Sequence, residues 1–287
     1  MKKLLISLSL LLLLVSCTTS TASISLSDGE SEIVTIGEQT INKDAIFNMM
    51  KSQDLGSTVV EIAKVTLVNS IIEVDETIEK RAQELLESNK EYFGESFESI
   101  VKNYYGSEEE FLETQLIPSA QQEALAKIYF EDNFDKIIAE NKPRQVIIVT
   151  TESQDDAQSI IDAMENDEDL PALLEELKID ESYGEPVIIA NTSSVPTDVL
   201  EFIQEGSIDD VTSEAILDEE TYYAIKILET DAETLREDFF TIFVSVSTNL
   251  DTMYQDYFKK HKFNVYDQQI YDAIKNDETL EGYNPNN

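Results

Sequence analysis

The chain has 287 residues, of which 59 are acidic and 20 are basic, so its formal net charge at neutral pH is −39. Such a charge repels phosphate backbones and argues against nucleic acid as a partner. The single cysteine excludes an intrachain disulfide and a cysteine-based zinc site, and the single histidine, His261, excludes histidine-rich metal centres. We therefore expect neither a metal nor a cofactor, and the composition argues against most enzyme classes.

Residues 1–17 have the parts of a bacterial lipoprotein signal. Lys2 and Lys3 precede an apolar run from Leu4 to Val15, which is shorter than the roughly 20 residues that a transmembrane helix needs. The run ends in Leu-Val-Ser-Cys, which resembles a lipobox, so we predict that Cys17 is lipidated and becomes the new N-terminus. An ordinary signal peptide with an incidental cysteine is the alternative. Residues 18–31, rich in Ser and Thr, are predicted to be a flexible tether.

Residues 32–142 are predicted to be mostly helical after a short opening strand at 33–36. The expected helix starts carry residues that cap N-termini well: Asn42, Thr58, Asp75 and Ser107. Apolar residues then recur at helical spacing as far as about residue 140. Pro118 predicts a bend within the last of these helices.

The pattern changes near Pro143. Strands are predicted at 145–150, 187–190 and 222–228, and helices at 155–166, 170–178 and 196–204. The predicted order of elements is β-α-α-β-α-β-β, which includes a fourth strand, just before the last, for which no bounds are predicted; together they form a compact α/β unit over residues 143–232. Residues 233–280 return to helix, and residues 281–287 are predicted to be a disordered tail.

This layout resembles the PrsA-type extracellular foldases of Gram-positive bacteria and the periplasmic SurA chaperones. Val34–Asp44 resembles the opening strand, turn and helix start of that family. Tyr105-Gly-Ser-Glu-Glu-Glu-Phe111 resembles its Tyr-Gly-x-x-x-x-Phe element, and Tyr257–Asp267 is similar to its C-terminal segment. The resemblance implies an α+β fold, in which residues 32–142 and 233–280 form a helical chaperone lobe like the SurA N-terminal domain.

The block 143–232 resembles a parvulin, a peptidyl-prolyl isomerase domain, inserted into that lobe. Active parvulins carry one histidine in the first strand, another in the last strand, and an Asp or Cys between them. The corresponding positions here hold Val146, Ala224 and Asp180. Valine and alanine cannot pass hydrogen bonds as imidazoles do. The resemblance therefore implies a degenerate site with no catalytic residues.

The function implied is a lipid-anchored chaperone on the extracytoplasmic face of the bacterial membrane, with unfolded or newly exported proteins as partners. Two alternatives stay open. One is an active prolyl isomerase with a rearranged site around Asp180 and nearby tyrosines, and the other is a substrate-binding lipoprotein of a transporter. The sequence leaves open whether the chain forms a homodimer.

Two further features bear on client binding. The predicted helical lobe is rich in methionine and aromatic residues that suit an adaptable apolar surface, although we expect most of them to pack its core: Met49, Met50, Phe93, Phe97, Phe111, Tyr129, Phe130, Phe239, Phe240 and Phe243. The block 143–232 has 24 acidic and 3 basic residues, a net charge of −21. We interpret that charge as solubilising, with a preference for basic clients as the alternative.

Overall fold

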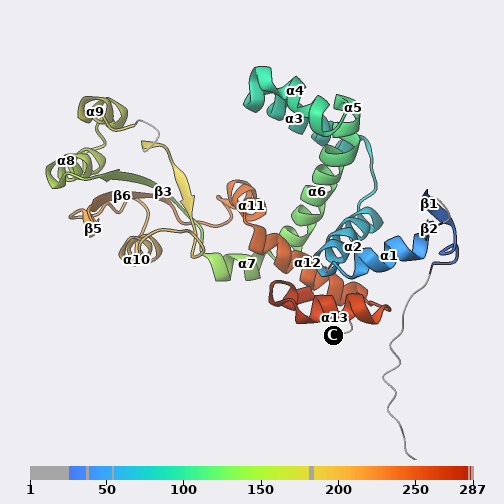
Figure 1. The fold of residues 1–287 in the computed structure, drawn as a ribbon. Helices are drawn as coiled ribbons and strands as arrows, with labels where there is room; N and C mark the ends of the chain where they lie inside the picture. Colours follow the sequence, from blue (N-terminus) through green and yellow to red (C-terminus); the bar gives the residue numbers. More distant parts are fainter. Residues whose placement is uncertain (1–25, 37–38, 54, 181–183, 284, 286–287) are drawn as a thin grey trace, which may run out of the picture. The chain divides into compact units, whose positions relative to one another are not determined.

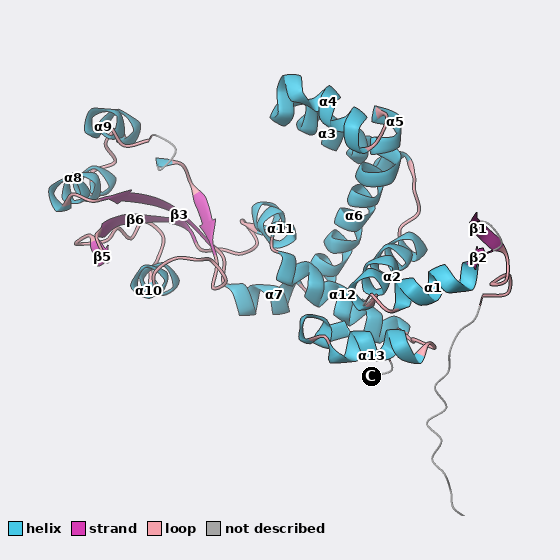
Figure 2. Cartoon of the chain, in the orientation of Figure 1, coloured by secondary structure: helices cyan, strands magenta, loops and turns pink. Residues whose placement is uncertain are grey.

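The structure is a computed structural model that describes residues 26–36, 39–53, 55–180, 184–283 and 285 (Figure 1). The predicted signal peptide and Cys17 lie outside the described residues. The chain divides into two compact units: residues up to Ala63 together with those from Tyr257 onward, and Lys64–Asp256. Helices predominate, as Figure 2 shows, and they are accompanied by two small antiparallel sheets, so the predicted α+β class is confirmed.

The first unit joins the two ends of the chain. Its elements, of which α2 and α12 extend into the second unit, are β1 (Glu32–Ile36), β2 (Gln39–Asn42), α1 (Lys43–Lys51), α2 (Gly56–Ile71), α12 (Ser247–His261), α13 (Gln268–Asn276) and a 3-10 helix, η4 (Glu278–Tyr283). Asn42 caps α1 as predicted, because its side chain accepts a hydrogen bond from the Ala45 amide at 2.9 Å. A Cβ atom at Gly56 would lie 3.2 Å from the carbonyl carbon of Ala273, so glycine lets the start of α2 approach α13 closely.

A buried ion pair ties α1 to α13. Lys51 Nζ lies 3.3 Å from Asp267 Oδ2, and the two side chains are only 3% and 2% exposed. The other carboxylate oxygen of Asp267 caps α13 by accepting hydrogen bonds from the amides of Gln269 and Ile270. The side chain of Gln269 donates in turn to the Lys51 carbonyl at 2.9 Å. The Asp267 carboxylate therefore binds the Lys51 ammonium group and caps α13 at the same time, and Gln269 adds a hydrogen bond to the main chain of α1.

The second unit contains a group of helices and an α/β block. Outside the α/β block, the helices that lie wholly in this unit are α3 (Glu76–Phe93), a 3-10 turn η1 (Gly94–Ser96), α4 (Phe97–Tyr104), α5 (Glu108–Phe111), a π-helical turn η2 (Leu112–Leu116), α6 (Ile117–Asp132), α7 (Phe134–Asn141) and α11 (Arg236–Ser245). Asp75 and Ser107 cap α3 and α5 as predicted.

The π-helical turn accounts for the expected irregularity at Pro118. Proline has no amide hydrogen, and its ring crowds the carbonyl four residues earlier, so a regular helix is not sustained through it. The wider turn η2 comes directly before α6, whose first turn contains Pro118. A second interruption, at Asn133, divides the long predicted helix into α6 and α7.

The α/β block has the predicted order of elements, β-α-α-β-α-β-β, which the structure confirms. The elements are β3 (Arg144–Thr151), α8 (Gln154–Glu165), α9 (Leu170–Leu177), β4 (Val187–Ile189), α10 (Thr197–Glu205), β5 (Ile216–Asp218) and β6 (Thr221–Glu229). The four strands pair in the order β4-β3-β6-β5, all antiparallel. Helices α8 and α9 cover one face of this sheet and α10 covers the other (Figure 1).

Both ends of the described part of the chain differ from the sequence expectation. The tether predicted for 18–31 is wrong for its last part: residues 26–31 form a turn that is fixed to the start of α1, with Lys43 Nζ 2.7 Å from Asp28 and the Lys43 amide 3.0 Å from the Ser31 carbonyl. The hydrogen bond from Lys43 lowers the pKa of Asp28. The tail predicted from 281 starts too early, because Leu280 and Tyr283 are buried and the Tyr283 ring packs against Phe258.

The block 143–232 does not separate as a compact unit of its own; it belongs to the second unit. Direct bonds join it to α7 and the residue that follows. The Asn191 amide donates to the Asn141 carbonyl at 2.8 Å, and the Gln204 side chain donates to the Lys142 carbonyl at 3.0 Å. Contacts of this kind, between residues about 50 and 60 positions apart, have no sequence signature.

We predict that Lys51→Met destabilises the first unit strongly, because it leaves the Asp267 carboxylate buried without its partner. Loss of one partner of a buried pair costs about 3–5 kcal/mol. Lys43→Met is the matched control, since it breaks the exposed pair with Asp28, which water screens. Urea unfolding should show a much lower midpoint for Lys51→Met than for Lys43→Met. Equal midpoints would contradict the role of the pair.

Candidate functional site

The three positions expected to correspond to a parvulin active site do not come together. Val146, on β3, is fully buried in the cluster beneath α10. Ala224, on β6, is fully buried in the cluster beneath α8 and α9, where its cross-strand neighbour is Val149. Val146 and Ala224 therefore lie on opposite faces of the sheet.

This geometry corrects the pairing of Val146 with Ala224. Two side chains can share one hydrogen-bond network only if they lie on the same face, because successive residues of a strand point to opposite sides. The β6 residues on the face of Val146 are Tyr223, Ile225 and Ile227, so the positions inferred on β3 and β6 are not both correct: one of the two is displaced by an odd number of residues. Either assignment leaves the block without histidine, since the chain's only histidine is His261.

Asp180 shares a side of the sheet with only one of these two positions. It is exposed and comes three residues after α9 ends at Leu177. Its neighbour Ile179 packs against the α8–α9 cluster, so this stretch lies on the side of Ala224 and not on that of Val146. An exposed carboxylate and two fully buried apolar side chains do not form a constellation for acid–base chemistry.

The buried polar groups of the block serve its own structure. Lys226, on β6, donates to the Met164 carbonyl at 2.9 Å and pairs with Asp167, which satisfies the end of α8. Thr212 is buried, and its hydroxyl accepts a hydrogen bond from the Ile225 amide at 3.2 Å. Arg144 donates to the Thr230 carbonyl at 3.0 Å. Two of the block's three basic side chains are thus engaged with main-chain carbonyls, and its surface is strongly acidic.

The aromatic and methionine residues of the helical segments mostly form core, as predicted. Phe130 is fully buried at the centre of four phenylalanine rings, whose centroids lie between 5.3 and 6.0 Å from its own. Seven of the ten candidates are buried: Phe97, Phe111, Tyr129, Phe130, Phe239, Phe240 and Phe243. The other three, Met49, Met50 and Phe93, are exposed by 56%, 47% and 39%.

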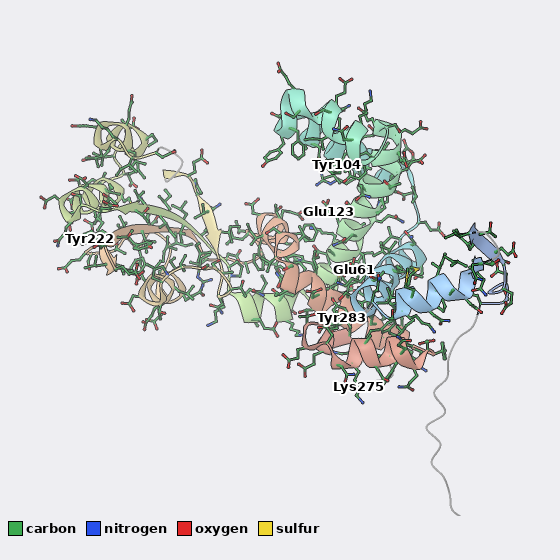
Figure 3. All side chains as sticks on the ribbon, in the orientation of Figure 1. Glu61, Tyr104, Glu123, Tyr222, Lys275 and Tyr283 are labelled. Atoms are coloured by element: carbon green, nitrogen blue, oxygen red, sulfur yellow. The ribbon has the colours of Figure 1, made fainter. Side chains whose placement is uncertain are left out.

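A groove of about 600 Å³ lies between α3, α6 and α11 in the second unit. Ion pairs cross it: Arg81 binds Glu123 at 3.0 Å, and Lys127 binds Glu237 at 2.9 Å. The hydrogen bond to Glu123, which Figure 3 labels on α6, raises the pKa of Arg81. Because these charges already satisfy one another and join the helices, we interpret the groove as structural.

Exposed apolar side chains gather at two other places, which include the sequence candidates Met49, Met50 and Phe93. In the first unit they lie on the β1–β2 hairpin and α1, where the exposed residues are Ile33, Val34, Ile36, Ile41, Met49 and Met50. In the second unit Tyr92, Phe93 and Tyr104 are exposed at the ends of α3 and α4; Figure 3 labels Tyr104 there. The sequence shows that these residues are apolar, but it does not show that their side chains remain exposed in the fold.

A comparison with family models and a comparison with curated proteins found no match. Among solved structures, the chain is similar to the foldase PrsA of Streptococcus pneumoniae, with 16% identity, coverage of 88% of this chain and 99% of that one, and a TM-score of 0.46. It is also similar to PrsA of Bacillus cereus, with 16% identity, coverage of 86% of this chain and 98% of that one, and a TM-score of 0.45. A SurA-like chaperone of Campylobacter jejuni has 17% identity to this chain, with coverage of 80% of this chain and 95% of that one, and a TM-score of 0.24.

The described part of the chain has neither a membrane-spanning helix nor a cluster of metal-binding side chains. None of the helices described there has the length and apolar character needed to span a bilayer. In the same residues no three His, Cys, Asp or Glu side chains are grouped so that they could hold a metal ion. Cys17, the predicted lipidation site, lies outside these residues.

Engineered histidine pairs test the assignment of sheet faces. Thr150 and Tyr223 are directly opposite on β3 and β6, and the strand alternation places them on the same face. We predict that Ni²⁺ raises the thermal unfolding midpoint of Thr150→His/Tyr223→His. The control, Thr150→His/Tyr222→His, moves the second histidine to the other face and should show no such shift. The reverse result would restore the pairing of Val146 with Ala224.

Proposed function

We propose that the protein is a lipid-anchored extracytoplasmic chaperone of the PrsA and SurA type, which binds unfolded exported polypeptides and has no prolyl isomerase activity. One observation carries this proposal. The α/β block, where an isomerase site would lie, contains no histidine, and Val146 and Ala224 are fully buried on opposite faces of its sheet, while the exposed apolar side chains of the hairpin, α1 and the ends of α3 and α4 lie on other elements.

The sequence supplies the compartment and the family resemblance. The lipobox-like end of the apolar N-terminal run supports anchoring at Cys17, and family-like motifs follow it in the expected order. The exposed apolar groups support client binding, because such groups on a soluble surface mark sites of interaction. Met49 and Met50 add flexible side chains that adapt to varied partners.

The two competing functions fit the geometry less well. A rearranged isomerase site would have to join Asp180 to nearby tyrosines, but of the two consecutive tyrosines on β6 only Tyr222 lies on the side of the sheet that Asp180 shares, while Tyr223 points to the other face. A transporter's substrate-binding lipoprotein needs two similar α/β lobes around a ligand. The described residues contain a single four-stranded sheet with helices on both faces.

An isomerase assay tests the lost activity. Prolyl isomerisation crosses a barrier of about 18–20 kcal/mol that amide resonance imposes. In a protease-coupled assay with a prolyl peptide, the chain from Cys17 onward should leave the rate at its uncatalysed value. A rate that rises in proportion to the amount of added protein would contradict the proposal and favour the rearranged isomerase.

An aggregation assay tests the chaperone activity directly. We expect the same chain to lower the light scattering of a chemically unfolded secreted protein diluted into buffer, because exposed apolar groups compete with self-association of the client. Albumin at equal mass is the control for non-specific crowding. Scattering equal to that of the albumin control would contradict the proposal.

A further inference from the structure

The β1–β2 hairpin is an unusually exposed piece of sheet. Its strands pair only with each other among the described residues, in the register Val34 with Ile41 and Ile36 with Gln39. Every residue of β1 is exposed, and so are the first three residues of β2. Ile33 is 51% exposed and Ile36 is 69% exposed. The hairpin therefore leaves apolar side chains on both faces and backbone groups along the outer edge of β1 open to solvent.

Soluble proteins usually protect such an edge. They place Lys or Pro on the outer strand, or cover it with another element. β1, Glu-Ile-Val-Thr-Ile, is charged only at Glu32, where its register with β2 also shifts, and neither β1 nor β2, Gln-Thr-Ile-Asn, contains Lys or Pro. A two-stranded hairpin is also only marginally stable by itself, and a third strand would add both hydrogen bonds and apolar contact. The hairpin thus has the features of a template for strand addition.

The edge is held on a fixed support. The turn before β1 is fixed to the start of α1 by the Lys43–Asp28 pair and by the hydrogen bond from the Lys43 amide to Ser31. The other end of α1 is held by the buried pair of Lys51 with Asp267. Met49 and Met50, exposed near the end of the same helix, give further apolar contact area on this unit. Because the edge is already ordered before binding, the binding site itself loses little conformational entropy when a strand is added.

Charge decides between the two kinds of strand that could bind. Glu30 and Glu32 are exposed beside β1, and the exposed cation nearest in sequence, Lys43, is already paired with Asp28. A second copy of the chain would bring the same acidic hairpin and another net charge of −39, so pairing between copies is repulsive. An unfolded segment with positive charges is attracted instead.

We propose that the outer edge of β1 binds an extended, basic segment of an unfolded polypeptide as an added strand. Main-chain hydrogen bonds would give affinity for many sequences, and alternate apolar side chains of the segment would contact Ile33, Val34 and Ile36. The inference rests on the proposed chaperone function and names its client class and its site.

Two unfolded probes of similar size test the charge preference. Reduced, carboxamidomethylated lysozyme is basic, and α-lactalbumin treated in the same way is acidic. Both would be titrated onto the chain from Cys17 onward, with fluorescence anisotropy as the readout. We expect the lysozyme chain to bind at least about tenfold more tightly at low salt, with the difference shrinking as salt screens the charges. Equal affinities would overturn the preference for basic clients.

Lysine substitutions test the site. Val34→Lys/Ile36→Lys adds charges to the exposed edge strand and should weaken lysozyme-chain binding by about tenfold or more. The matched control is Ile62→Lys/Val65→Lys on α2, where the replaced side chains are also exposed, by 61% and 51%. This control adds the same charge and should change the affinity by less than about twofold. Equal losses in both variants would overturn the assignment to β1.

Hydrogen exchange distinguishes strand addition from looser contact. Bound lysozyme chain should slow exchange of the β1 amides in the wild type and leave exchange of the α2 amides unchanged. Binding without β1 protection would overturn strand addition.

Sedimentation of the free protein addresses the second-copy alternative, and a dimer that the β1 substitutions dissociate would overturn the proposal. If the wild type binds neither probe, the chaperone function itself fails; if it binds but the β1 variant binds equally well, only this inference fails.

Discussion

The buried contact between Lys51 and Asp267 is the constraint on which the first unit depends. It joins residues 216 positions apart, one at the end of α1 and the other at the start of α13. Two charges removed from water are tolerated only when each has its partner and the remaining polar atoms are bonded. Here one carboxylate oxygen binds the ammonium group and the other caps a helix. The pair therefore couples the hairpin's support, α1, to the C-terminal helices and makes both ends of the chain necessary for one unit.

The α/β block shows a different solution, in which apolar packing occupies both faces of a sheet. β3 and β6 contribute to two clusters, one beneath α10 and one beneath α8 and α9. Once both faces are filled, the sheet has no buried polar network at the positions where a parvulin site was expected. The block has the element order β-α-α-β-α-β-β and many acidic residues. The hairpin, α1 and the ends of α3 and α4 also carry exposed apolar side chains.

The acidic charge links these two observations. If the proposed site on β1 is correct, a net charge of −39 would repel a second copy of the chain and attract basic partners more than acidic ones. An unprotected edge strand is an aggregation hazard when the molecules carry little charge. On a strongly anionic protein the same edge is disfavoured from pairing with a second copy, while it stays open to a cationic strand. The acidic composition and the exposed edge thus both favour binding of a cationic strand over pairing with a second copy.

The sequence by itself determined most of the elements and, within the block 143–232, their order, but it did not predict β2, the break between α6 and α7, or the full extent of η4. Caps at Asn42, Asp75 and Ser107, the β-branched run of β3 and the helical spacing of apolar residues are local signals, and each depends on neighbours within a few positions. It also determined that the block contains no histidine, whatever the alignment. Only the tertiary structure decided that Val146 and Ala224 lie on opposite faces, because a shift of one residue in an apolar strand leaves its composition unchanged and reverses its faces. The tertiary structure likewise decided which apolar residues remain exposed, since burial depends on whether a distant segment such as Leu280–Tyr283 returns to cover them.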